Sequence, residues 1–121
     1  MYIETYRSYC LQKQSVKESF PFDQKTLVFK VAGKIFTLAS IEPFESINVK
    51  CDPNKAIQLR EKYASVLPGY HMNKQHWNTI ILNKELSDSQ VFKLIDHSYQ
   101  LILEALPKRI LHSSLFQPPK K

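Results

Sequence analysis

The sequence predicts a single α+β domain with two layers, in which helices pack on one face of an antiparallel sheet. Hydrophobic residues make up 43% and charged residues 23% of its 121 residues, the balance of a globular domain with an ample core. Apolar residues recur at helical spacing in some segments and alternate with polar residues in others. The strand-like segments follow one another in runs, which favours antiparallel pairing. The predicted order of elements is α-β-β-β-α-β-β-α.

The chain is expected to form one domain over residues 1–112, followed by a short tail over residues 113–121. No internal repeat is visible, and only the end, SSLFQPPKK, has the composition of a linker. No segment reaches the length of about 18 apolar residues that a membrane span needs, and the start lacks the features of a secretion signal. The two cysteines, Cys10 and Cys51, have no close spacing and fit a reducing compartment. We therefore expect a cytoplasmic protein with no membrane contact.

The first element is predicted to be an amphipathic helix that ends near Lys13. Because Cys10 falls on its apolar face, we interpret this cysteine as a small buried hydrophobic residue rather than a reactive thiol. The apolar face is largely aromatic and consists of Tyr2, Ile3, Tyr6, Tyr9 and Cys10.

Residues 26–39 are predicted to form two strands joined by a turn at Ala32 and Gly33. A two-residue loop would divide their side chains between two faces, of which the first is expected to be the core side. These faces are Leu27, Phe29, Val31, Lys34, Phe36 and Leu38 on one side, and Val28, Lys30, Ile35 and Thr37 on the other. A third strand over residues 47–51 alternates in the same way, so Lys30 and Lys50 are expected on the exposed face.

The second helix is predicted to begin at Asp52 and Pro53 and to end before Pro68. A carboxylate at this position accepts hydrogen bonds from free backbone N–H groups, and proline suits the first helical position. The inward side chains of this helix are Ala56, Leu59 and Tyr63.

Residues 69–82 are predicted to form a hairpin with residues 73–76 as its turn. Ser87, with Gln90 three residues later, forms a capping box that opens the last helix, and Pro107 ends it. The buried stripe of that helix consists of Val91, Leu94, Ile95, Ser98, Leu101, Ile102 and Leu106.

No fingerprint of a phosphate-binding loop, a nucleophile elbow or a helical zinc site is present. We therefore predict no catalytic residues, no metal and no cofactor. Two alternatives stay open. One is a metal at His71 and His76, with Cys51 or Asp52 as further ligands. The other is a Cys51 nucleophile with a histidine base, although strand parity points Cys51 into the core.

The densest group of polar and aromatic residues lies at positions 70–78. It combines aromatic rings, amides, histidines and a lysine, and the whole chain carries a net charge of +6. Such a mixture suits contact with a nucleic acid, where cations meet phosphates and aromatic or amide groups meet bases. In the alternative interpretation, Tyr70 and Trp77 pack against the domain while the polar residues form a solvated turn.

Four stretches of the sequence resemble a known family. They are VFKVAGKIFTL, then INVKCDP followed by AIQLREKY, then PGYHMNKQHWNTIIL, and finally LIDHSYQLI. Together they are similar to the MmcQ/YjbR family, and the resemblance extends over residues 1–107. It implies a CyaY-like or secretion-chaperone-like fold and a DNA-binding role attributed to a double-wing arrangement of strands. The family motif falls on Lys50, Cys51, Asp52 and Pro53, and on Gly69, Tyr70, His71, Asn73, Lys74, His76, Trp77 and Asn78.

Our leading hypothesis is a non-enzymatic protein that binds duplex DNA with low sequence specificity. Lysines would contact phosphates, and residues 71–78 would form a recognition wing. Two of the three arginines lie in predicted helices whose packing is unrelated to this wing, which leaves few groups for bidentate contacts to guanine. The predicted nucleic-acid-binding residues are Lys30, Lys34, Lys50, His71, Asn73, Lys74, His76, Trp77 and Asn78.

A rival hypothesis is a protein-interaction or chaperone-like adaptor with a protein partner. It would use the open face of the sheet, where Val28 and Ile35 are expected to be exposed apolar residues beside Lys30.

Overall fold

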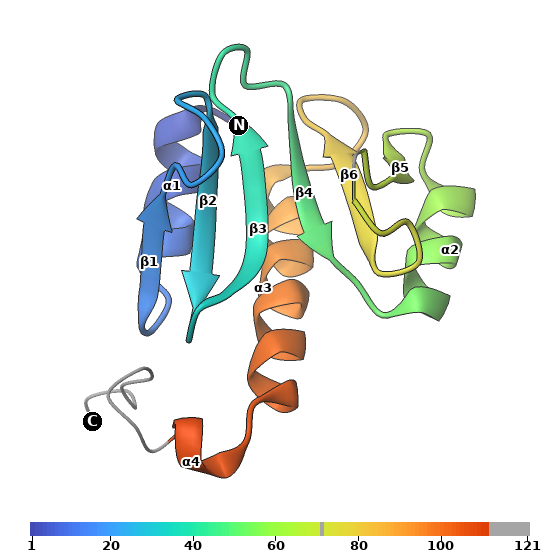
Figure 1. The fold of residues 1–121 in the computed structure, drawn as a ribbon. Coiled ribbons are helices and arrows are strands. Elements are labelled where there is room, and N and C mark those ends of the chain that lie inside the picture. The colour runs from blue at the N-terminus through green and yellow to red at the C-terminus, as the bar shows by residue number, and fades with distance from the viewer. Residues whose placement is uncertain (71, 112–121) are drawn as a thin grey trace.

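In a computed structural model, which describes residues 1–70 and 72–111, the chain forms a six-stranded antiparallel sheet with the strand order β1-β2-β3-β4-β6-β5. Helices cover one face of this sheet (Figure 1). The elements are α1 (Ile3–Leu11), β1 (Val16–Ser19), β2 (Thr26–Val31), β3 (Lys34–Ser40), β4 (Ser46–Lys50), α2 (Pro53–Lys62), β5 (Val66–Pro68), β6 (Trp77–Ile81), α3 (Asp88–Ala105) and α4 (Lys108–Leu111).

The predicted two-layer α+β class is confirmed, and the structure adds two short elements that the sequence pattern did not indicate. The first is β1, a largely polar strand at the edge of the sheet, where pairing needs only one neighbour and the apolar alternation is weak. The second is α4, which follows Pro107 directly. The predicted tail, residues 113–121, lies outside the described residues.

The core lies between the sheet and helices α1 and α3. Among the largest fully buried side chains are Tyr6 of α1, Phe29 of β2, Ile80 of β6 and Ile95 of α3. The predicted helical stripes are largely correct, but Tyr2 is 80% exposed and Tyr99, which lay outside the predicted stripe, is buried. The buried residues of α3 are Val91, Leu94, Ile95, Ser98, Tyr99 and Ile102.

A β-bulge in β3 changes which side chains face the core. Phe29 pairs with Thr37, whereas the next residue of β2, Lys30, pairs with Ile35, so Phe36 is the extra residue. Because a bulge reverses the alternation beyond it, Thr37 turns to the helices, where its hydroxyl lies 2.9 Å from the hydroxyl of Tyr6. Leu38 pairs with Val28 on the opposite face. The prediction that Leu38 faces the core and Thr37 faces away is therefore wrong.

Ser98 joins the two halves of the sheet. Strands β3 and β4 pair only at Thr37 with Val49 and at Leu38 with Asn48. Beyond these pairs, the Ser98 hydroxyl on α3 accepts a hydrogen bond from Lys50 N at 2.9 Å and donates one to the carbonyl of Phe36. One buried hydroxyl thus satisfies two backbone groups that the strand ladder leaves unpaired.

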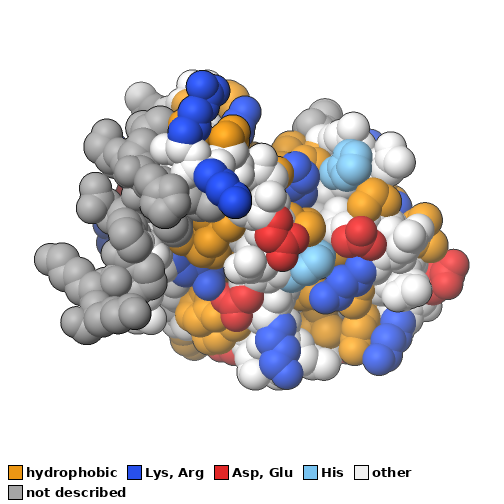
Figure 2. All heavy atoms as spheres, turned by 90° about the horizontal axis from the view of Figure 1, so that it is seen from below, with side chains coloured by type: hydrophobic (Ala, Val, Ile, Leu, Met, Phe, Trp, Pro, Cys, Tyr) orange, Lys and Arg blue, Asp and Glu red, His pale blue; other side chains and the backbone are white. Residues whose placement is uncertain are grey.

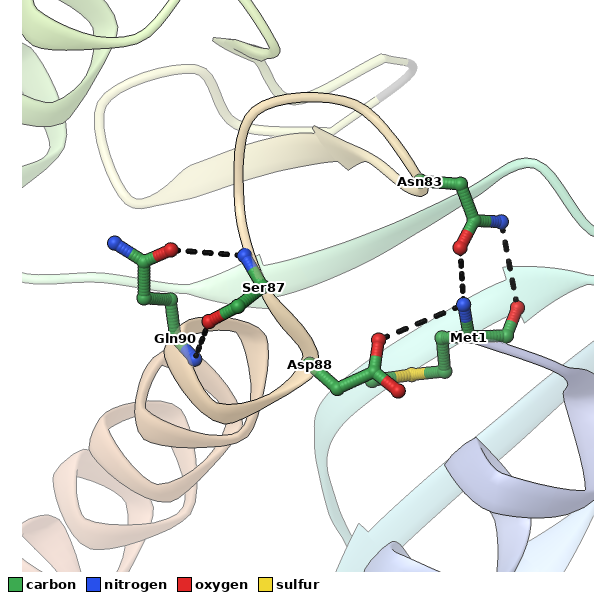
Figure 3. Close-up of polar contacts among 5 residues, drawn as sticks. All are labelled: Met1, Asn83, Ser87, Asp88 and Gln90. Carbon is green, nitrogen blue, oxygen red and sulfur yellow. Dashed lines mark hydrogen bonds and ion pairs between the residues drawn. The ribbon is translucent and has the colours of Figure 1, made fainter.

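Both predicted helix caps are present. Ser87 N donates to Gln90 Oε1 at 2.8 Å and Gln90 N donates to Ser87 Oγ at 3.2 Å, as Figure 3 shows. The carboxylate of Asp52 accepts from Lys55 N at 3.1 Å, with Pro53 at the start of α2.

The start of the chain is tied to the start of α3 (Figure 3). The amine of Met1 donates to Asn83 Oδ1 and lies 3.5 Å from the carboxylate of Asp88. None of the helices in residues 1–70 and 72–111 has the length and apolar character to cross a lipid bilayer.

Candidate nucleic-acid interface

Several predicted site residues that are far apart in sequence lie at one end of the sheet, the lower end in Figure 1. The turn at Ala32 and Gly33 joins β2 to β3 there, and β4 ends there at Lys50. Because Lys50 pairs with Trp77, the first residue of β6, the loop before Trp77 lies at the same end. We call this region the basic end, and its charged residues are Lys17, Lys30, Lys34, Lys50, Asp52, Lys55, Lys74, Glu104, Lys108 and Arg109.

The opposite end of the sheet carries the opposite balance of charge. It holds the connections that follow β1, β3 and β6, together with the first turns of α1 and α3. We call it the acidic end, and its charged side chains are Glu4, Asp23, Lys25, Glu42, Glu45, Glu61, Lys62, Lys84, Glu85 and Asp88. The fold therefore separates charges that alternate along the sequence.

Figure 2 looks onto the basic end and shows Lys and Arg side chains spread across it, with acidic and hydrophobic side chains among them. Lys34 and Lys74 are exposed, while Lys30 and Lys50 are half-buried on the face away from the helices. Among the described residues, none of these four ammonium groups has an ion-pair partner. Their charge is thus available to an external anion.

Arg60 of α2 holds the loop that carries Lys74. Its Nε donates to Asn78 Oδ1 at 2.7 Å, and its Nη2 donates to the carbonyls of Lys74 and, at 3.3 Å, of Trp77. The expectation that helical arginines are unrelated to the wing is therefore wrong for Arg60. Sequence patterning missed this residue, whose only signal was its place in the AIQLREKY motif.

Gly69 fixes the other side of this loop. Its N–H donates to the carbonyl of Trp77 at 2.8 Å. A Cβ added at Gly69 would lie 2.7 Å from Trp77 Cβ, closer than side-chain atoms approach one another. The loop can therefore close against β6 only where residue 69 has no side chain.

Asn73 and His76 contribute hydrogen bonds to the backbone of this loop and of its neighbour. Asn73 Oδ1 accepts from Gln75 N at 2.9 Å, and the carbonyl of His76 accepts from Cys51 N at 2.8 Å. Trp77 is half-buried opposite Lys50 on the face away from the helices. His71 lies outside the described residues.

Asn78 does not belong to the exposed surface. It is 0% exposed, and besides its bond to Arg60, its Nδ2 donates to the carbonyl of Ala56 at 3.4 Å. Its amide therefore links β6 to α2, which corrects the prediction that it contacts nucleic acid. Its burial follows from its pairing with the core residue Val49, which places both side chains on the helix side of the sheet.

The described titratable groups near this end, Cys51 and His97, do not form an activated nucleophile. Burial raises the pKa of the Cys51 thiol to about 11, so it is protonated at neutral pH, unlike reactive cysteines. Burial, followed by the charge of Lys55, lowers the pKa of His97, whose Nε2 accepts a hydrogen bond from Asp52 N at 3.2 Å. In residues 1–70 and 72–111, no three His, Cys, Asp or Glu side chains are grouped so as to hold a metal ion.

The apolar residues expected on the open face are less accessible than predicted. Val28 is 0% exposed and Ile35 is half-buried, so the expectation of an exposed Val28 is wrong. Phe20 and Phe22, near the acidic end, are 47% and 65% exposed, and further exposed apolar side chains are Ile57 of α2, Leu67 of β5 and Tyr70. Phe20 borders a hollow of about 460 Å³ that is also lined by Ile3, Arg7, Glu18, Ser19, Leu27 and Ile41.

Comparison with known proteins gives consistent relatives over most of the chain. The model of the YjbR family matches residues 11–101. The Escherichia coli proteins YbdF and YjbR are 38% identical over 107 residues and 34% identical over 109 residues. The match to YbdF covers 88% of both chains, and the match to YjbR covers 89% of this chain and 92% of that relative.

Two solved structures are similar to this fold. The DUF419 domain protein DR2400 of Deinococcus radiodurans aligns with a TM-score of 0.85 and 32% identity, over 92% of this chain and 86% of that one. A Pseudomonas syringae protein aligns with a TM-score of 0.70 and 28% identity, over 84% of this chain and 98% of that one.

Proposed function

The chain belongs to the YjbR family, and we propose that it binds duplex DNA through the basic end of its sheet, without catalysing a reaction. The observation that supports this proposal is the convergence of Lys34, Lys50 and Lys74 from three separate segments onto one end, with their ammonium groups unpaired among the described residues. Such lysines attract phosphates, and each contact releases counterions from the duplex.

The arginines support low sequence specificity. Arg7 forms an ion pair with Glu18, and Arg60 is used by the Lys74 loop and Asn78, which leaves Arg109 of α4 as the one arginine of the described residues that is exposed and unengaged. A guanidinium that is already engaged is not free for a bidentate contact to guanine. Lysines, which act as point charges, would then contact the backbone in a way that depends little on base sequence.

The loop between β5 and β6 supports a wing-like contact. Arg60 donates a hydrogen bond to the carbonyl of Lys74, and Gly69 N donates one to the carbonyl of Trp77, so the backbone on each side of this loop is held by bonds within the domain. Preorganisation lowers the entropy that is lost when a loop is ordered on binding. Lys74 would therefore contact a phosphate at a smaller entropic cost than a lysine on a mobile tail.

The test is a titration of duplex DNA at several salt concentrations. We expect micromolar binding at low salt and a linear fall of log affinity with log salt. The triple variant Lys34→Ala, Lys50→Ala, Lys74→Ala should flatten this slope by about three units, about one per phosphate contact. Its matched control removes three lysines of the acidic end, Lys25, Lys62 and Lys84, and should keep the slope. The absence of a complex at micromolar protein in low salt would refute the proposal.

A second candidate is a protein-interaction module, which is favoured by the exposed Phe20 and Phe22 and by the hollow beside them. This surface lies toward the acidic end, away from the lysines of the proposed DNA contact. Phe22→Ser should leave DNA binding unchanged if the first proposal is correct, because residue 22 would lie outside that interface.

A further inference from the structure

We propose that Lys17 and Lys30 form a binding site for a phosphate group on the face of the sheet away from the helices. The positions of the two lysines support a phosphate site independently of the proposed function. That the phosphate belongs to the backbone of DNA rests on the proposed function. Lys17 belongs to β1, the edge strand that the sequence pattern did not reveal.

The register of β1 and β2 brings the two lysines together. Lys17 pairs directly with Lys30, between the pairs Val16 with Val31 and Glu18 with Phe29. Residues that are directly opposite in an antiparallel pair project to the same face, with Cβ atoms about 4.5 to 5.5 Å apart. Because Val31 and Phe29 are buried in the core, both lysines point to the other face.

No carboxylate of the described residues neutralises this pair. The neighbouring acid, Glu18, points to the helix side and pairs with Arg7. Neither Lys17 nor Lys30 has an ion-pair or hydrogen-bond partner for its ammonium group within residues 1–70 and 72–111. Two like charges opposite each other in a sheet destabilise it, so an anion bound between them would be stabilising.

A hollow lies where such an anion would sit. It has a volume of about 110 Å³ and is lined by Ser15, Lys17, Lys30, Ala32 and Gly33. One water molecule needs about 10 to 15 Å³ of such space, so the hollow has room for a small tetrahedral oxyanion with part of its hydration. A Cβ added at Gly33 would meet no atom within 4 Å, so the hollow is open on the side of the turn. An ammonium on each side of a phosphate gives charge-assisted hydrogen bonds, which are stronger than neutral ones.

The position of the site fits a backbone phosphate of a bound duplex. Strands β1 and β6 are four steps apart in the sheet, which is about 19 Å at about 4.8 Å per strand. Duplex DNA carries one charge per roughly 1.7 Å of its axis, so Lys17 beside β2 and Lys74 before β6 would contact different phosphates of one duplex. The site therefore extends the proposed contact to the far edge of the sheet.

The test follows backbone amide signals by NMR while inorganic phosphate is added to the whole protein at constant ionic strength. We expect shifts for residues 15–17 and 30–34 that saturate with phosphate and do not occur with chloride. Lys17→Glu should abolish them, whereas Lys25→Glu, which makes the same change in charge at the acidic end, should retain them. Lys17→Glu should also raise Tm by about 1 to 3 °C, because it replaces cross-strand repulsion with attraction. A destabilised Lys17→Glu variant, or phosphate shifts that survive in it, would overturn the site.

A DNA titration of Lys17→Ala separates this inference from the proposed function. We expect the salt slope to fall by about one unit. If the slope is unchanged while the triple lysine variant still loses its binding, the site is wrong and the DNA contact stands. If phosphate shifts the amide signals of residues 15–17 and 30–34 but no duplex binds, the two lysines bind a free phosphate group. The proposed DNA contact is then wrong.

Discussion

The two ends of the sheet use their charged residues in different ways. At the acidic end, carboxylates stabilise the chain itself: Asp23 Oδ1 accepts from Lys25 N at 2.8 Å and Thr26 N at 2.7 Å, and Glu85 accepts from Ser65 N at 2.7 Å. At the basic end, loops are held by Arg60 and by backbone carbonyls, while the ammonium groups of Lys34 and Lys74 have no described partner. Asp23 and Glu85 are therefore used within the fold, whereas the ammonium groups of Lys34 and Lys74 are not paired with any described residue.

The largest effect is expected from Trp77→Ala at the basic end. We expect a loss of about 3 kcal/mol of folding free energy, because the half-buried Trp77 lies opposite Lys50 in the sheet and Gly69 closes against its Cβ and carbonyl. Urea denaturation measures this loss. A variant that keeps its stability but binds DNA more weakly by about 1 to 3 kcal/mol would mean that the indole stacks on a base instead.

Arg60→Ala tests whether the basic end depends on an internal guanidinium. We expect a loss of about 2 kcal/mol, because buried Asn78 loses a charged donor and two loop carbonyls lose a partner. Arg60→Lys should restore little of the lost folding free energy, since one ammonium cannot reproduce the forked geometry of the guanidinium. Denaturant unfolding checks both variants, and full rescue by lysine would show that charge alone is needed.

Lys74→Ala separates binding from stability within the same loop. We expect unchanged stability and weaker DNA binding for all sequences alike, with a salt slope flatter by about one unit. Lys84→Ala at the acidic end is the control and should leave the slope as it is. An unchanged slope for Lys74→Ala in a protein that binds DNA would place the wing elsewhere.

Asp23→Ala gives a smaller, pH-dependent effect confined to the acidic end. Hydrogen bonds from the backbone N–H groups of Lys25 and Thr26 and from the Thr26 hydroxyl lower the pKa of this carboxyl from its ordinary value. A lowered folded-state pKa contributes stability above the unfolded value, and this contribution is lost as pH falls through the folded value. The Tm difference between wild type and variant should therefore be present at neutral pH and vanish in strong acid, with DNA binding unchanged throughout.

The smallest expected effect is that of a chelator. Treatment with a metal chelator should leave Tm unchanged. The hydrophobic core is large enough to fold without a metal, and the described residues form no cluster of metal ligands. A drop in Tm that one divalent ion restores would mean that the basic end holds a metal.

The sequence by itself determined those features that depend on neighbouring residues. The capping box of Ser87 and Gln90, the start of α2 at Asp52 and the burial of Cys51 follow from local hydrogen bonding or from the alternation of one strand. The lysines of the predicted contact, among them Lys50 and Lys74, could be chosen from charge and from the family motif.

Other features depend on how distant segments pair with one another, and only the tertiary structure decided these. The bulge at Phe36 exchanged the faces of Thr37 and Leu38, and the pairing of β1 with β2 placed Lys17 opposite Lys30. Hydrogen bonds from the Arg60 guanidinium join α2 to the buried Asn78 and to the loop that carries Lys74. Side-chain alternation repeats every two residues, so a single extra residue in one strand reverses the faces beyond it, and only the paired strands reveal where that residue lies.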